Sequence, residues 1–170
     1  MNLKDIIRTI PNYPIEGVLF RDITTVLKNK DALKQSVNEI TKNLQNIEFD
    51  YVLGPESRGF IFAMPIAYNM NKGFIPVRKA GKLPAETISK EYSLEYGTST
   101  LEIHKDALKK GDKVIIVDDL LATGGTCKAI IELVESIGAK VVSLNFFIEL
   151  EQLKGRKLLG DYNIVSVVKY

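Results

Sequence analysis

The stretch from Val114 to Thr126, which reads V-I-I-V-D-D-L-L-A-T-G-G-T, restricts the possible folds of this chain more than any other segment. It opens with four consecutive β-branched apolar residues, which are typical of a parallel strand buried on both faces. Asp118 and Asp119 follow at the carboxyl end of this strand, where open α/β sheets bind their ligands. A small glycine-containing loop then leads into a helix expected from about Thr126 to Ser136. The segment therefore predicts an α/β fold with a ligand site at this strand end.

The loop and the acidic pair before it suit different parts of one ligand. Glycines let backbone N–H groups close around a phosphate at the positive end of the following helix. Carboxylates repel a phosphate, so Asp118 and Asp119 must face another group; vicinal ribose hydroxyls donate hydrogen bonds that carboxylates accept. We therefore predict a sugar-phosphate site. Acids that only complement the helix dipole are one alternative. A Walker-type phosphate loop is another, but it needs a lysine that G-G-T lacks.

The rest of the chain alternates between expected strands and helices. Helices are expected at residues 3–10, 31–45, 60–70 and 126–136, and strands at 49–53, 74–77, 114–117, 141–148 and 164–168. Residues 12–24 are expected to form a loop, Ser57 is the expected N-cap of the third helix, and residues 92–104 alternate weakly, as in a ribbon. This order predicts one α/β domain, with a doubly wound, mainly parallel sheet flanked by helices.

Composition restricts the setting of the protein. With 170 residues, of which 45% are hydrophobic and 26% charged, the chain fits one globular domain. Its net charge of +2 does not indicate a nucleic-acid binder, and no segment resembles a signal peptide or a membrane span. The single cysteine, Cys127, excludes an internal disulfide, and the single histidine, His104, is interpreted as a surface residue. We expect a cytoplasmic protein without nucleic-acid or membrane partners.

Two short segments carry cations suited to a second anionic group. Gly54 to Gly59 reads G-P-E-S-R-G after an expected strand, so its backbone donors and the Arg58 fork are suited to a diphosphate. A tight turn with a surface arginine is the alternative. Arg78 to Pro84 reads R-K-A-G-K-L-P and places three cations at another strand end. It opens the polar stretch 78–106, and such stretches in compact domains are often active-site lids.

The run at residues 114–126 resembles the phosphoribosyl-diphosphate motif of the type I phosphoribosyltransferases. Three other segments are similar to those of the adenine-specific members of this family: P-I-E-G-V-L-F-R-D-I at 14–23, R-K-A-G-K-L-P at 78–84 and E-Y-S-L-E-Y-G at 91–97. These motifs occur in the family's order and extend the resemblance from about residue 8 to 157. The resemblance implies transfer of a 5-phosphoribosyl group from phosphoribosyl diphosphate to adenine, which gives AMP and pyrophosphate. It also implies a homodimer and a single domain, residues 1–170, with an N-terminal hood at about 1–28 and a flexible lid at about 80–104.

The resemblance further implies a role for each matching residue. Asp118 and Asp119 bind the ribose hydroxyls; the 5′-phosphate is bound by Ala122, Thr123, Gly124, Gly125 and Thr126, and the pyrophosphate by Glu56, Ser57, Arg58, Arg78, Lys79 and Lys82. Phe20 stacks on the purine, Leu19 and Arg21 read its edge through backbone groups, and Glu95 and Tyr96 act as catalytic residues. The cofactor is Mg²⁺, which we expect on the diphosphate because no acidic cluster resembles a protein cage. The family often has a cis peptide in the pyrophosphate loop, here between Glu56 and Ser57.

Ala122 separates the adenine enzymes from their nearest relatives. Enzymes that act on hypoxanthine and guanine carry an aspartate at this position, whereas alanine cannot do acid–base chemistry. Glu95 is the carboxylate that the adenine enzymes supply instead. Glu56, where the family often has aspartate, is a mild departure. The alternative in another functional class is a regulator that senses phosphoribosyl diphosphate and binds DNA; this chain has neither the charge nor the length for an added DNA-binding element.

Overall fold

The computed structural model describes residues 1–94 and 97–170. Its α-helices are α1 (Leu3–Ile6), α2 (Thr24–Lys28), α3 (Lys30–Lys42), α4 (Arg58–Asn69), α5 (Gly125–Ser136) and α6 (Gly155–Leu159), with a 3₁₀ turn η1 (Glu151–Leu153). Its strands are β1 (Arg8–Pro11), β2 (Leu19–Asp22), β3 (Tyr51–Pro55), β4 (Gly73–Lys79), β5 (Thr87–Ser93), β6 (Thr98–His104), β7 (Lys113–Leu121), β8 (Lys140–Glu149) and β9 (Ile164–Lys169). None of the helices in the described ranges is long and apolar enough to cross a bilayer.

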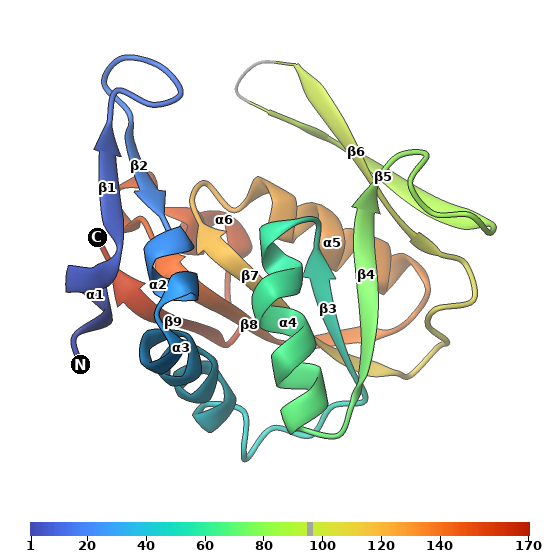
Figure 1. The fold of residues 1–170 in the computed structure, drawn as a ribbon. Helices are drawn as coiled ribbons and strands as arrows, with labels where there is room; N and C mark the ends of the chain where they lie inside the picture. The colour runs from blue at the N-terminus through green and yellow to red at the C-terminus, as the bar shows by residue number, and fades with distance from the viewer. Residues whose placement is uncertain (95–96) are drawn as a thin grey trace.

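Seven strands form the central sheet in the order β5-β6-β4-β3-β7-β8-β9 (Figure 1). Five neighbouring strands, β4, β3, β7, β8 and β9, run parallel to one another. The β5–β6 ribbon adds antiparallel strands at the β4 edge. The predicted mainly parallel sheet with flanking helices is therefore confirmed. Because parallel strands share one direction, the carboxyl ends of β3, β4 and β7 meet at the same edge of the sheet.

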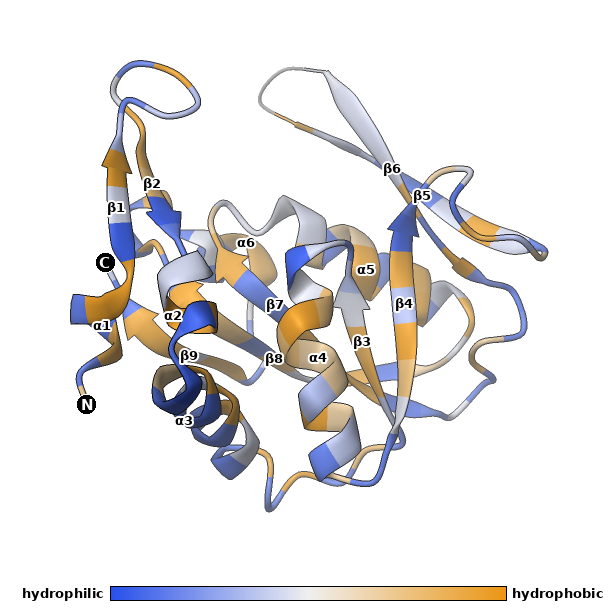
Figure 2. Cartoon of the chain, viewed as in Figure 1, coloured by the Kyte–Doolittle hydropathy of each residue, from blue (hydrophilic) through white to orange (hydrophobic). Residues whose placement is uncertain are grey.

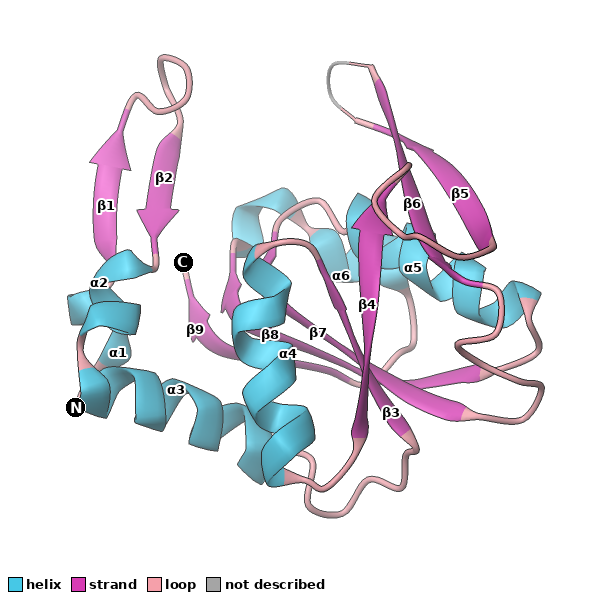
Figure 3. Cartoon of the chain, turned by 45° about the vertical axis from the view of Figure 1, so that its right-hand side comes forward, coloured by secondary structure: helices cyan, strands magenta, loops and turns pink. Residues whose placement is uncertain are grey.

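Alternate side chains of the buried strands pack into two apolar layers, one on each face of the sheet. Ile115 and Val117 of β7 join the layer under α3 and α4, where Phe62 and Phe147 pack with ring centroids 4.9 Å apart. Their neighbours along β7 join the layer under α5, on the opposite face (Figure 3). Burying side chains of this size stabilises the fold by about 1.5–3 kcal/mol each. β4 is apolar along most of its length and hydrophilic at its carboxyl end (Figure 2).

The N-terminal segment differs from the sequence prediction. The helix expected over residues 3–10 ends at Ile6, and Ile10 lies in β1 opposite Phe20 of β2. Residues 12–24 were expected to form a loop but contain β2 and the start of α2. The helical spacing of Leu3, Ile6, Ile7 and Ile10 is overridden by partners far along the chain.

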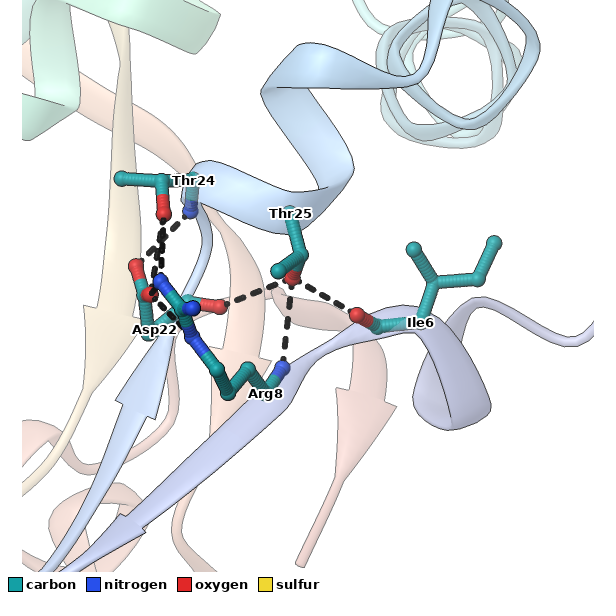
Figure 4. A network of polar contacts seen from close by, with 5 residues as sticks. All are labelled: Ile6, Arg8, Asp22, Thr24 and Thr25. Atoms are coloured by element: carbon teal, nitrogen blue, oxygen red, sulfur yellow. Dashed lines mark hydrogen bonds and ion pairs between the residues drawn. The ribbon is translucent and has the colours of Figure 1, made fainter.

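A polar network supplies those partners (Figure 4). The carboxylate of Asp22 accepts hydrogen bonds from Arg8 Nε at 2.9 Å, from the Thr24 backbone N–H at 2.9 Å and from the Thr24 hydroxyl at 2.9 Å. The Thr25 hydroxyl donates to the Ile6 carbonyl at 2.6 Å and accepts from the Arg8 backbone N–H at 3.2 Å. These bonds make the turn from α1 into β1 more favourable than another helical turn, and they fasten the β1–β2 hairpin to α2.

Most of the segment predicted as a lid belongs to a second antiparallel ribbon, formed by β5 and β6. The expected ribbon at residues 92–104 begins earlier, at Thr87, and pairs with β4 through Arg78↔Glu102 and Lys79↔Leu101. Lys90 of β5 forms an ion pair with Glu132 of α5 at 2.7 Å. The ribbon is thus attached to both the sheet edge and α5 in this structure.

Candidate functional site

A pocket of about 470 Å³ opens at the carboxyl ends of β3 and β7, beside the amino end of α5. It brings together eleven of the predicted site residues from three segments: Glu56, Ser57, Arg58, Lys79, Asp118, Asp119, Ala122, Thr123, Gly124, Gly125 and Thr126. The remaining lining is mostly apolar and comes from β3, β5, β6, β7, β8 and α5: Pro55, Tyr92, Leu101, Leu120, Leu121, Cys127 and Phe146.

The loop at the amino end of α5 has the geometry of an anion site. Gly124 is the residue before the helix and has φ +90°, a left-handed conformation that side-chain-bearing residues rarely adopt. Its carbonyl accepts the first helical hydrogen bond, from Lys128 N–H at 2.9 Å. The first N–H groups of a helix have no helical partner, and the helix dipole is positive at this end. The loop can therefore bind a phosphate through backbone donors.

The acidic pair lies deeper in the sheet than the sequence pattern suggested. β7 continues through both acids to Leu121, so they are strand residues, not the start of the loop. Asp119 is 6% exposed, and its Oδ2 lies 2.8 Å from Arg58 Nε. Asp118 Oδ1 accepts the backbone N–H of Asp119 at 2.8 Å. The pair thus presents carboxyl oxygens at the floor of the pocket, beside one guanidinium.

Burial dominates the electrostatics of this pair. It raises the pKa of Asp118 well above its ordinary value, and the neighbouring Asp119 carboxylate adds to the rise. Burial also raises the pKa of Asp119, and the Arg58 guanidinium opposes that rise. Carboxyl groups held this way gain from neutral hydrogen-bond donors, and ribose hydroxyls are such donors.

The loop after β3 is held by its own acidic residue. Glu56 Oε1 accepts hydrogen bonds from Arg78 Nε at 3.1 Å and from the Lys79 backbone N–H at 2.8 Å. Arg78 Nη1 also donates to the Lys82 carbonyl at 3.1 Å. The peptide bond between Glu56 and Ser57 is cis. The Glu56 side chain therefore links β3 to the end of β4, and Arg78 and Lys82 lie beside the pocket and do not appear among its described lining residues.

Ser57 occupies the predicted N-cap position of α4, but the predicted capping bond is wrong. Its backbone is already helical, with φ −105° and ψ −32°, and among the described residues its side chain makes no capping hydrogen bond. The Asx-type and Ser-type cap needs an extended backbone at this position. Ser57 lines the pocket, and its hydroxyl is not used to cap the helix.

The predicted base-binding residues of β2 lie next to the pocket, not in its described lining. The Phe20 ring packs edge-on against Tyr13, with centroids 5.1 Å apart, and the Arg58 guanidinium carbon lies 5.6 Å from the Phe20 centroid. Arg21 points away: its guanidinium carbon lies 3.7 Å from the Tyr170 ring centroid. This alternation along β2 turns Phe20 toward Arg58.

The predicted catalytic residues, Glu95 and Tyr96, lie outside the described residues. A neighbouring residue, Tyr92, was not singled out from the sequence. It is half-buried and lines the pocket, and its hydroxyl lies 3.5 Å from the Thr126 hydroxyl. Its signal was present in the weak alternation that begins at Tyr92, because a strand turns every second side chain to the same face.

The lone cysteine and histidine are not part of a metal site in the described residues. Cys127 is buried in α5, and burial raises the pKa of its thiol. His104 is half-buried at the end of β6, where its Nε2 accepts the Ala85 backbone N–H at 3.3 Å. Across residues 1–94 and 97–170, no three His, Cys, Asp or Glu side chains gather as metal ligands.

Comparison with known proteins agrees with this geometry. A family model described as the phosphoribosyl transferase domain matches residues 23–169. The chain is 58% identical over 170 residues to the adenine phosphoribosyltransferase of Clostridium novyi (strain NT), covering 100% of this chain and 99% of that protein. The crystal structure of adenine phosphoribosyltransferase from Thermoanaerobacter pseudethanolicus superposes with a TM-score of 0.96 at 54% identity, covering 99% of this chain and 98% of that one.

A third relative was solved with ligands. The Saccharomyces cerevisiae adenine phosphoribosyltransferase, complexed with an imino-altritol bisphosphate and adenine, has a TM-score of 0.90 at 40% identity and covers 97% of this chain and 96% of that one. The two solved relatives share the fold over nearly the whole chain. The chain therefore belongs to the phosphoribosyltransferase family, among the adenine phosphoribosyltransferases.

Proposed function

We propose that this protein transfers the 5-phosphoribosyl group of phosphoribosyl diphosphate to adenine and so forms AMP and pyrophosphate. The observation that carries the proposal is the pocket itself. The pocket brings together the Asp118–Asp119 carboxyl pair, a glycine loop at the amino end of a helix, and the loop that carries Arg58. A ligand with a ribose between two phosphate groups matches this order of sites.

Each segment takes one part of the substrate. The amides of Ala122 to Thr126 bind the 5′-phosphate, and Asp118 and Asp119 accept hydrogen bonds from the ribose hydroxyls. The loop at Glu56 to Arg58 binds pyrophosphate with Lys79, while Arg78 and Lys82 extend the positive charge at the edge of the pocket. Glu56 acts through its bonds to Arg78 and Lys79, which fix the loop against β4.

The reaction is a substitution at the anomeric carbon with a transition state that resembles an oxocarbenium ion. The protein contributes by holding the ribose in place, by stabilising the charge on departing pyrophosphate and by presenting N9 of the base. Arg58 and Lys79 both line the pocket, which supports their role in stabilising this charge.

Magnesium fits this pocket as a partner of the diphosphate. Asp119 is already paired with Arg58, so the carboxyl pair suits waters of a hydrated ion better than direct coordination. When bound, Mg²⁺ neutralises charge on the pyrophosphate group. Asp118 and Asp119 would orient its waters as well as the ribose hydroxyls.

Adenine is placed by the hood and the segment around Glu95. Phe20 stacks on the purine, and the backbone groups of Leu19 and Arg21 read its edge. Ala122, which lines the pocket, stands where a 6-oxopurine enzyme has an acid. In this proposal Glu95 and Tyr96 supply the acidic and phenolic groups instead. The yeast relative, which was solved with adenine, supports this choice of base.

A four-base assay tests the proposal. The protein is incubated with phosphoribosyl diphosphate, Mg²⁺ and, separately, adenine, hypoxanthine, guanine or xanthine, and the nucleotide formed is quantified by chromatography. We expect efficient turnover of adenine alone. Equal turnover of any 6-oxopurine would contradict the specificity, and absence of nucleotide with all four bases would contradict the activity.

We also propose a homodimer that forms through the outer face of α4. Tyr68 is 80% exposed and Met64 is 50% exposed on this helix, four residues apart and therefore on one face. Exposed apolar groups that gather on one helix face are typical of a protein contact. A two-fold axis would place the same face of each protomer against the other.

A further inference from the structure

The backbone of the loop at Ala122 to Gly125 rests directly on a second segment, residues 150–159. A Cβ atom added to Gly155 would lie 2.5 Å from the Ala122 carbonyl oxygen and 2.8 Å from Leu121 Cδ1. A Cβ atom on Gly124 would lie 3.1 Å from the Gly155 carbonyl oxygen. Figures 1 and 3 show α6 beside the amino end of α5. Only glycine at residue 155 permits this approach of two backbones.

The position of Gly155 is fixed by the next residue along the chain. Arg156 forms a two-point ion pair with Glu149 at the end of β8, with Nε to Oε1 at 2.7 Å and Nη2 to Oε2 at 2.8 Å. Arg156 Nη1 also donates to the Ile164 carbonyl of β9 at 3.0 Å, and the Ser166 hydroxyl donates to Glu149. The first residues of α6 are therefore bonded to two strands of the central sheet.

The geometry of this ion pair is more tightly fixed than that of a typical surface ion pair. Glu149 is 3% exposed, and the hydrogen bonds from Arg156 hold the pKa of its carboxyl below the ordinary value. The Arg156 side chain is 41% exposed, and the desolvation of the buried Glu149 carboxylate offsets part of its attraction to Arg156. A planar two-point contact does, however, fix orientation, which a flexible apolar contact does not. The Glu149–Arg156 ion pair is therefore better suited to fixing the position of Gly155 than to stabilising the fold.

We propose that Gly155 and the Glu149–Arg156 pair are positioning residues for the phosphate loop. They hold residues 150–159 as a rigid support, called here the brace, against which the Ala122–Gly125 backbone takes the shape that directs its amides at the 5′-phosphate. The proposal rests on the assignment of the 5′-phosphate to this loop. Supports of this kind decide whether a binding group lies within reach of its ligand.

The first test is Gly155→Ala. The added methyl group must displace the Ala122 carbonyl, so we expect KM for phosphoribosyl diphosphate to rise about 10- to 100-fold, the scale of loss known for small misplacements in active sites. KM for adenine should stay within about twofold because, among the described residues, Leu19 to Arg21 make no hydrogen bond or ion pair with the brace. The matched control is Gly73→Ala, whose Cβ atom would meet Tyr51 Cδ1 at 2.9 Å at the far end of the sheet. The control should keep both KM values.

The second test grades the ion pair. Arg156→Lys keeps the charge but loses the two-point fork, and Arg156→Gln loses both, so KM for phosphoribosyl diphosphate should rise in that order. Amide hydrogen exchange of residues 121–125 in the free protein should quicken in the same order. A purely structural role would lower the melting temperature of these variants and leave the KM for phosphoribosyl diphosphate unchanged. That result overturns the proposal.

Gly124→Val separates the two levels of the argument, because it blocks the phosphate loop whatever the brace does. If Gly124→Val raises the KM for phosphoribosyl diphosphate and the Gly155 and Arg156 variants do not, the brace proposal is wrong and the phosphate assignment stands. If none of these variants changes that KM, the phosphate assignment is wrong and the brace proposal falls with it.

Discussion

At the scale of single residues, Asp22 makes folding depend on pH. The Thr24 backbone N–H and the Arg8 side chain lower its pKa from 3.8 to about 2. A carboxyl whose pKa is lower in the folded state stabilises the fold above its unfolded pKa and loses that contribution as pH falls. We expect wild-type stability in urea to drop between about pH 4 and pH 2 by more than that of Asp22→Asn. Asp161→Asn, a change at an exposed carboxyl, is the control and should follow the wild type; equal pH slopes for all three would contradict the prediction.

Glu95 carries a prediction about chemistry. Glu95→Gln keeps the size of the side chain and removes its charge, so a group that acts in the transition state should lower kcat and kcat/KM together, by roughly 10²- to 10⁴-fold. Glu91→Gln makes the same change in the same segment at an exposed residue and serves as the control. Full kcat in Glu95→Gln, or a loss that only follows a lowered melting temperature, would show that the residue is not catalytic.

At the scale of elements, the accuracy of sequence-based prediction depended on where the partners lie. β7 and α5 were predicted because a run of β-branched residues and a glycine loop specify strand and helix locally. The β1–β2 hairpin was missed because Arg8 owes its strand conformation to Asp22, fourteen residues away, which no local pattern reveals. The brace was not predicted for the same reason, because its contacts join residues far apart in the sequence. Gly155 and Arg156 read as an ordinary turn and a surface cation until their contacts with Ala122 and Glu149 are known.

The candidate site followed the same rule. Its strand-end acids and glycine loop were found from the sequence because each belongs to a contiguous motif. The pairing of Arg58 with Asp119, and of Glu56 with Arg78, was not predicted, because the partners in each pair come from segments far apart in the sequence. Sequence patterns identified which segments build the pocket, but not which cation each acid would select.

At the scale of the whole molecule, the exposed face of α4 gives a prediction for assembly. We expect the wild type to sediment as a dimer and Tyr68→Glu to sediment as a monomer, because a charge on this face would be buried without a partner. Ile15→Glu alters an apolar residue that is 55% exposed in the hood, and it should leave the dimer intact. A monomeric wild type, or a dimeric Tyr68→Glu variant at the same concentration, would contradict the assignment of this face.

In the proposed arrangement, the contact between Arg58 and Asp119 couples the binding of pyrophosphate to the binding of the ribose. Pyrophosphate that draws Arg58 away leaves a buried carboxyl without its counter-ion, a loss that ribose hydroxyls then make good. Filling either site alone therefore costs free energy that filling both recovers, and by thermodynamic linkage each ligand must tighten the other by the same factor. Intact phosphoribosyl diphosphate would therefore bind more tightly than its separate halves, because one molecule supplies both the pyrophosphate that pairs with Arg58 and the ribose hydroxyls that bond to Asp119.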